Sequence, residues 1–187
     1  MGLFLGRRGI FQPLIISFSV LIFSSLVGYD FPLSFTLSTL FSSIFSSSNT
    51  VRAFWEDMAI NRIILVYGKE GGFFLPYLLT FAISLIVNLS TLFFSFLIFN
   101  FFGFREIFGV LVWTFSSSAL NVIISIIGEM ARVNLEFFSA ILLIPLLLGI
   151  YGFLSSENPW IYLFLMIILG FFYLSFAYLI SDLLFEI

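Results

Sequence analysis

The charged residues of this chain are confined to short gaps between long apolar blocks. Residues 73–181 hold only six charged side chains in 109 residues, and none of the six lies inside an apolar block. A spanning helix needs about 20 apolar residues to cross a hydrocarbon core of roughly 30 Å, and a charge inside that core is costly. The pattern therefore predicts an integral membrane protein of packed helices, forming one domain over residues 1–187.

The composition limits the chemistry that this chain can perform. Hydrophobic residues make up 61% and charged residues 9%, with a mean hydropathy of +1.22, whereas a soluble domain carries about 25% charged residues. The net charge of −3 argues against a nucleic-acid partner. The chain has no cysteine and no histidine, which removes thiolate nucleophiles, Cys/His metal sites and a histidine general base. We therefore expect no enzyme activity, no metal and no cofactor.

Five apolar blocks are predicted to cross the bilayer. They occupy residues 10–28, 73–102, 107–128, 137–154 and 160–181. The fourth block is short and contains Pro145, whose freed carbonyl can be satisfied by neighbouring helices. The fifth begins with Trp160 and Tyr162, which are typical of a membrane interface. The expected fold class is an all-α, polytopic helix bundle that crosses the cell membrane several times.

Residues 31–67 are amphipathic. In Phe31–Ser48, apolar residues recur at helical spacing and five serines fall on the other side, while Phe54–Val66 has a charged polar face. Such segments favour interfacial helices that lie in the plane of the membrane with the apolar face down. The alternative makes Phe31–Ser48 a sixth span, or a re-entrant element that lines a polar path.

The distribution of basic residues favours the alternative. With five spans and the N-terminus inside, three basic residues are cytoplasmic and four lie outside. With six spans, six basic residues are inside and only Arg105 lies outside. Because cytoplasmic loops carry an excess of Lys and Arg, charge favours six spans, whereas apolarity favours five. We predict five, with six as the alternative.

A small set of polar residues in and near the blocks is the candidate polar interface or cavity. The strongest groups are the two asparagines, and the set comprises Asn88, Asn121, Ser34, Ser38 and Ser42. As structural residues they would bond across helix interfaces, each bond contributing about 0.6–2 kcal/mol. As functional residues they would line a cavity for a small neutral solute or a lipid head group.

One local pattern is more specific. A long apolar helix ends in a glycine turn, a basic–acidic pair follows, and the next helix begins with aromatic residues; the turn comprises Gly103, Phe104, Arg105, Glu106 and Phe108. This arrangement resembles the Yip membrane domain family (Ypt/Rab-interacting-protein type). The order of segments, with one N-terminal span, an amphipathic stretch and four C-terminal spans, is also similar to that family, in its short prokaryotic type.

The resemblance implies a function without catalysis. It implies a membrane accessory or scaffold protein that acts through contacts with other integral membrane proteins, an ABC-type exporter among them. The alternative is a six-span, solute-binding subunit of a membrane transporter for a neutral or apolar small molecule. In either case the expected partners are the lipid bilayer and other membrane proteins.

Overall fold

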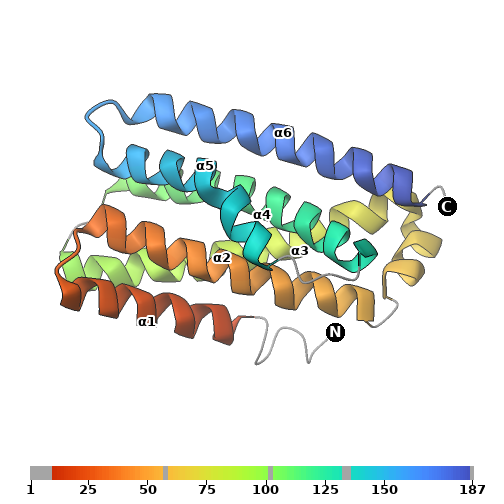
Figure 1. Ribbon diagram of the computed structural model, residues 1–187, viewed down its shortest axis with the longest axis horizontal. Coiled ribbons are helices and arrows are strands. Elements are labelled where there is room, and N and C mark those ends of the chain that lie inside the picture. The colour runs from red at the N-terminus through yellow and green to blue at the C-terminus, as the bar shows by residue number, and fades with distance from the viewer. Residues whose placement is uncertain (1–9, 57–58, 101–102, 132–135, 186–187) are drawn as a thin grey trace.

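Six antiparallel helices make up the described part of the chain (Figure 1). The computed structural model describes residues 10–56, 59–100, 103–131 and 136–185, with the backbone alone for 46–56, 59–64, 67, 69–72, 125–126, 128–131, 136–139 and 181–185. No strand occurs in these ranges. The helices are α1 (Phe11–Val27), α2 (Phe31–Glu56), α3 (Ala59–Phe99), α4 (Phe104–Ala131), α5 (Glu136–Ser155) and α6 (Pro159–Phe185).

Short turns join the helices in pairs at one end of the bundle, on the left in Figure 1. Gly28 ends α1 in the left-handed conformation, at φ 92°, where a residue without a Cβ has no steric penalty. Asp30 then begins α2, because its Oδ1 accepts the backbone N–H of Leu33 at 3.2 Å, as a helix N-cap does. Between α5 and α6, Pro159 takes the first helical position, where its missing N–H costs nothing.

Helix α3 contains a sharp break at Gly68. This residue has φ 74° and ψ −179°, far from helical values, so Ala59–Tyr67 and Lys69–Phe99 are two straight pieces joined at a corner. The first piece includes the end of the predicted amphipathic segment Phe54–Val66. Of that segment's side chains only Leu65 and Val66 are described, and both are exposed.

Among the residues that the structure describes, three helices are long and apolar enough to cross a membrane, fewer than the five predicted. They are Phe73–Phe99, Phe104–Ile124 and Pro159–Ile180. The shorter apolar helices are Phe11–Val27, Phe31–Phe45 and Ala140–Ser155. Helix α1 has 17 residues, which at 1.5 Å each extend about 25 Å, the lower limit for a span. The expected class, an all-helical protein compatible with a membrane, is confirmed at this level.

The first amphipathic segment occupies a different position from the interfacial one that we predicted. Helix α2 packs against α1, α3, α4 and α5. Its serine face is turned into the bundle: Ser34, Ser38 and Ser42 are all buried. The serines therefore face other helices rather than water, an arrangement closer to the alternative of a sixth helix in the bundle.

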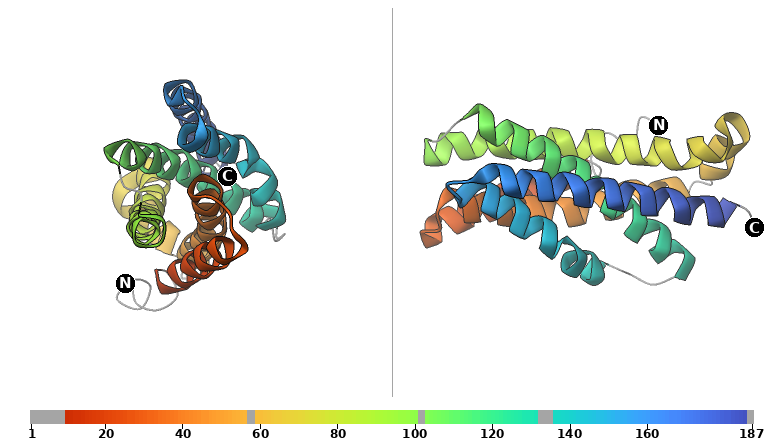
Figure 2. Two further views of the ribbon diagram at one scale, coloured as in Figure 1. Left: turned by 90° about the vertical axis from the view of Figure 1, so that its left-hand side faces the viewer. Right: turned by 90° about the horizontal axis from the view of Figure 1, so that it is seen from above.

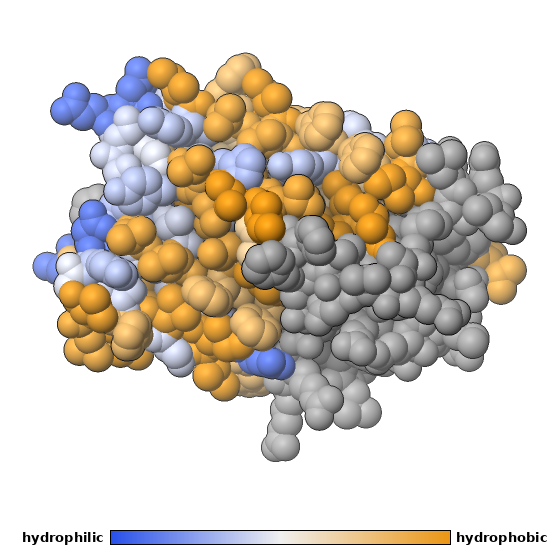
Figure 3. Space-filling view, in the orientation of Figure 1, coloured by the Kyte–Doolittle hydropathy of each residue, from blue (hydrophilic) through white to orange (hydrophobic). Residues whose placement is uncertain are grey.

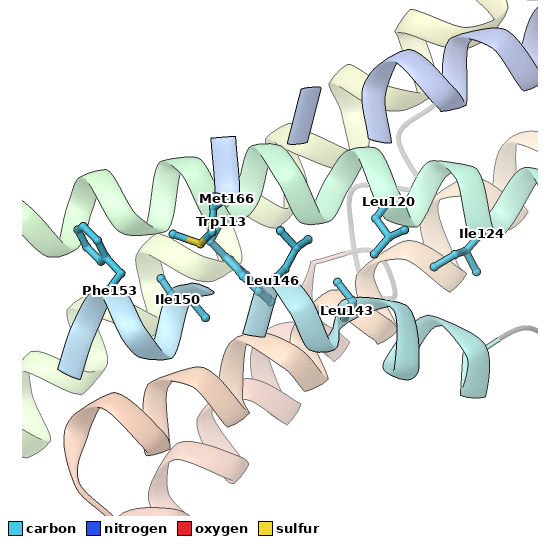
Figure 4. Close-up of a cluster of buried hydrophobic side chains, with 8 residues drawn as sticks. All are labelled: Trp113, Leu120, Ile124, Leu143, Leu146, Ile150, Phe153 and Met166. Atoms are coloured by element: carbon cyan, nitrogen blue, oxygen red, sulfur yellow. The ribbon is translucent and has the colours of Figure 1, made fainter. Parts of the chain in front are cut away.

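The described apolar core consists of three clusters that share α4. Side chains of α4, α5 and α6 form the cluster of Trp113, Leu120, Ile124, Leu143, Leu146, Ile150, Phe153 and Met166 (Figure 4). Phe73 and Tyr77 of α3 pack with α4 and with Ala177 of α6. Phe31 and Phe35 of α2 pack with Leu92 of α3 and Val110 of α4. Helix α6 lies at the edge of the bundle when this is viewed end-on (Figure 2). In the coloured part of the face that Figure 3 shows, hydrophobic residues cover much of the surface, while hydrophilic residues gather mainly at the end with the short turns.

Candidate functional site

Buried hydroxyl and amide side chains gather on α2, α3 and α4, which pack against one another, and we call this set the polar seam. On α3 its members recur every three or four residues from Thr80 to Ser95, which places them on one face over about 22 Å. All are at most 3% exposed. The polar seam comprises Ser34, Ser38, Ser42 and Ser43 of α2, Thr80, Ser84, Asn88, Thr91 and Ser95 of α3, and Thr114, Ser117, Ser118 and Asn121 of α4.

Asn88 is the centre of the polar seam and joins three helices. Its Oδ1 accepts a hydrogen bond from Ser42 Oγ of α2 at 3.2 Å. Its Nδ2 donates to Thr114 Oγ1 of α4 at 3.0 Å. Two predicted site residues, Ser42 and Asn88, are thus in direct contact. Thr114, which the prediction did not select, is the third member of this group.

The other predicted residues have separate partners. Asn121 Nδ2 donates to the backbone carbonyl of Ser43 at 3.2 Å, which ties α4 to α2. Ser38 Oγ donates to the carbonyl of Ser34 at 2.9 Å, and Ser34 Oγ donates to the carbonyl of Tyr29 at 3.4 Å. The two asparagines therefore belong to two distinct contacts, and Ser34 and Ser38 bond carbonyls of their own segment of the chain.

Most hydroxyls of the polar seam donate to their own helix. The acceptors are carbonyls three or four residues earlier, at 2.7–3.4 Å, for Ser38, Ser42, Thr80, Thr91, Ser95, Thr114 and Ser117. This pairing satisfies a hydroxyl donor without help from a neighbouring helix. Small, locally satisfied residues also let helix backbones approach closely. The seam can therefore be buried at little cost.

Two further polar contacts attach the outer helices, and the sequence analysis did not anticipate them. Ser17 of α1 lies 2.7 Å from Thr91, oxygen to oxygen. Since the hydroxyl of Thr91 also donates to Val87, Ser17 is the better donor in this pair. On α6, the carbonyl of Met166 accepts from Ser116 Oγ at 2.8 Å. The three- and four-residue spacing of hydroxyls from Thr80 to Ser95 was the signal that could have revealed the seam.

Gly103, Arg105 and Glu106 were predicted to form a turn between two helices. In the structure only Gly103 of these three lies between α3 and α4. Arg105 and Glu106 were predicted to lie in the gap between blocks 73–102 and 107–128. Helix α4 begins at Phe104, so both residues lie in its first turn. A Cβ on Gly103 would lie 2.2 Å from Glu106 Oε2, so this carboxylate occupies the space that any other side chain would need.

Arg105 links the start of α4 to the end of α5. Its Nη2 donates to the carbonyls of Phe153 and, at 3.3 Å, of Ser156. The guanidinium also lies 5.2 Å from the centroid of the Phe153 ring. A cation at the C-terminal end of a helix satisfies its last carbonyls and interacts favourably with the helix dipole. Arg105 is therefore the C-terminal cap of α5.

No family model matches this chain, and no curated protein or solved structure matches it either. The resemblance to the Yip family therefore stays a prediction that rests on the turn residues and on the order of the segments.

Proposed function

We propose that this chain is a non-catalytic integral membrane protein, of accessory or scaffold type, which acts through contacts with other membrane proteins. The observation that carries the proposal is the distribution of polarity. Polar side chains meet one another inside the bundle, while the outer face of α6 exposes large apolar residues, namely Trp160, Ile161, Phe164, Leu165, Ile168, Phe171, Phe172, Phe176, Tyr178 and Leu179. Such an inside-out arrangement suits lipid and helical partners, which are as apolar as the face itself.

Helix α6 is the preferred docking face because it is aromatic and preorganised. Phe172 and Phe176 stack with a 3° angle between their rings, and Phe171 packs edge-on against Phe115 of α4. Large aromatic side chains are enriched at protein interfaces because they contribute much contact area with little loss of freedom. An ABC-type transporter is the partner class that the Yip resemblance suggests.

Photo-crosslinking in the membrane tests this function. A photoreactive phenylalanine analogue is placed at Phe164 or Phe172 on α6, with Phe11 and Phe23 on α1 as exposed controls. We expect a discrete crosslinked membrane protein from α6 and none from α1. Crosslinks to lipid alone at all four positions would contradict a scaffold role.

We further propose that all six helices cross the membrane. Support comes from α2, which packs among four other helices, and from the basic residues, which a six-span arrangement would divide into six on one side and Arg105 on the other. Cysteines introduced at Gly2 and Ile187 of this cysteine-free chain should react from the same side with an impermeant maleimide. A cysteine at Glu157 should react from the opposite side. Labelling of the two ends from opposite sides would restore the five-span model.

A second candidate function is a solute-binding subunit of a transporter for a neutral small molecule. The observation that favours it is a pair of buried hydroxyls, Ser43 Oγ and Ser118 Oγ, without hydrogen-bond partners among the described residues. A thermal-shift screen of neutral metabolites separates the two functions. A metabolite that stabilises the parent, but neither Asn88→Leu nor Asn121→Leu, would favour the solute-binding subunit.

A further inference from the structure

Helix α1 presents a short apolar surface on the outside of the bundle. It has 17 residues, which extend about 25 Å. The apolar part of α6, Pro159–Ile180, has 22 residues and extends about 33 Å. Both helices expose large apolar side chains along this length, such as Ile15 and Phe23 of α1 and Phe164 and Ile168 of α6. Lipid beside α1 therefore meets a shorter apolar surface than lipid beside α6.

Two side-chain contacts fix the depth of α1 relative to α3, which runs in the same direction (Figure 1). The hydroxyl oxygens of Ser17 and Thr91 are 2.7 Å apart. One residue further along α1, the ring of Phe18 stacks on that of Phe94, with 4.4 Å between the ring centroids. Because α1 packs against both α2 and α3, it cannot slide along the bundle to make up for its length.

The shortfall of α1 lies at one end of the bundle only. From the contact between Ser17 and Thr91 toward the short turns, α1 continues for ten residues to Val27 and α3 for eight residues to Phe99. These two ends are therefore nearly level. In the other direction α1 continues for six residues to Phe11, about 9 Å, whereas the apolar part of α3 continues for 18 residues to Phe73, about 27 Å. Figure 1 shows α1 stopping well before the end that α6 reaches.

Polar groups prevent the apolar surface of α1 from continuing past either end. Exposed Gln12 follows the first helical residue, and Arg8 precedes that residue by three positions in the sequence. At the other end, exposed Asp30 begins α2. A charge within the hydrocarbon core is costly. A core of roughly 30 Å is thus about 5 Å thicker than α1, and tilting the helix would enlarge the difference.

We propose that α1 recruits phospholipids with short acyl chains and thins the bilayer beside it, in the leaflet at the end opposite the short turns. A bilayer accommodates a short hydrophobic segment by local thinning, at a cost that rises with each ångström of mismatch. Shorter chains lower this cost, so such lipids should collect beside α1 but not beside α6. The inference rests on the proposed crossing of the membrane by α1 and adds the class of lipid that this helix selects.

Fluorescence quenching by brominated lipids tests the inference on the full chain in vesicles. The cysteine-free chain receives a bimane label at Ile15→Cys on α1 or at Phe172→Cys on α6, both exposed positions. They are matched in depth, since Ile15 lies 12 residues before Val27 and Phe172 lies 13 residues after Pro159. The vesicles hold equal amounts of phosphatidylcholine with 14-carbon and with 18-carbon chains, and the bromine is carried by one or the other.

We expect the 14-carbon lipid to be enriched about threefold over the 18-carbon lipid beside the label on α1, and not beside the label on α6. Replacing Arg8 and Gly9 together by leucine lengthens the apolar run of the sequence by two residues, so it should lower the enrichment beside α1. Equal quenching by the two lipids at Ile15→Cys would overturn the inference and leave the six spans standing.

Aqueous iodide separates the remaining outcomes. Quenching of the α1 label by iodide, and not by bromine, would place α1 in water and would overturn its crossing of the membrane together with the lipid preference. A label on α1 that neither agent quenches would mean that protein covers this helix, as in an assembly with a second copy, and would overturn the lipid preference alone.

Discussion

Helices α4 and α6 are similar in length and both apolar, yet most residues of α4 are buried and most residues of α6 are not. In the most apolar 18-residue stretch of each, 72% of the residues are buried in α4 and 17% in α6. Helix α4 contacts α2, α3, α5 and α6 and carries Thr114, Ser117, Ser118 and Asn121 on its buried surface. Helix α6 exposes Ile161, Phe164 and Ile168. The more polar helix is therefore the central one.

This contrast is the reverse of a water-soluble bundle, where polar residues lie outside. In lipid, apolar surface gains little from burial against another helix, because acyl chains are equally apolar. Contact between a polar group and lipid is instead destabilising, whereas contact between two polar groups is stabilising. The distribution in α4 and α6 is the one expected in that solvent.

The largest effect is expected at Trp113, which is fully buried between α4 and α5 (Figure 4). Trp113→Ala should lower the free energy of unfolding by about 3–5 kcal/mol, through the cavity it leaves. The indole N–H has no hydrogen-bond partner among the described residues, so the loss is one of packing alone. Trp160 on α6 is 64% exposed, and Trp160→Ala is the matched control.

Reversible unfolding in mixed detergent measures both tryptophan variants. We expect Trp160→Ala to change stability by less than about 1 kcal/mol, because surface substitutions outside packed regions have small effects. If the two variants lost equal amounts of stability, α6 would be as enclosed as α4, and the contrast between the two helices would not hold.

The next effect concerns a close contact of the two helices, at Gly170 of α6. A Cβ there would lie 2.5 Å from Ser116 Oγ and 2.7 Å from the Phe115 ring. Gly170→Leu should therefore cost about 1–3 kcal/mol through overpacking, and it should break the bond from Ser116 to Met166. Ser175→Leu adds the same side chain at an exposed position of α6 and serves as the control. A stable Gly170→Leu variant would show that α6 can move away from α4 freely.

The sequence predicts the helices of this fold well, because five apolar blocks overlap α1, α3, α4, α5 and α6. It predicts the location of α2 poorly. Serine content is a poor guide to solvent exposure, since each hydroxyl can bond its own helix, as Ser38 does with Ser34. The partners of Asn88 depend on how three helices meet, and no local pattern encodes that meeting.

The close packing at glycines could not be predicted from the sequence either. On α5, Gly149 and Gly152 lie against Met166 and Tyr162 of α6, although their three-residue spacing does not match the four-residue contact motif. Likewise, Arg105 could be predicted as a turn residue but not as the cap of α5. Both contacts join segments distant in the sequence, so local pattern alone could not predict either one.

A smaller effect is expected at the centre of the polar seam. Asn88→Leu removes the bonds to Ser42 and Thr114, but each of these hydroxyls keeps a carbonyl of its own helix, at 3.0 and 2.7 Å. The change in stability should therefore be only about 1 kcal/mol, in either direction. Asn121→Leu, which removes a bond to a backbone carbonyl, is a matched second case. A loss above about 3 kcal/mol for either variant, measured by the same unfolding assay, would mean that the seam depends on bonds between helices.

The smallest effect is expected on the outer face of α6. Phe164 is 65% exposed, so lipid or detergent chains can replace the atoms that Phe164→Leu removes, and stability should change by less than about 0.5 kcal/mol. Partner binding should respond differently, because a ring in a protein interface contributes shape and area that leucine does not reproduce. We therefore expect an unchanged Tm for the isolated chain together with a reduced yield of the crosslink from Phe172.

A large drop in Tm of the isolated chain would instead mean that protein already covers this face, as in an assembly of several copies. An unchanged crosslink yield would place the partner away from Phe164, and the docking face would have to be sought elsewhere on α6.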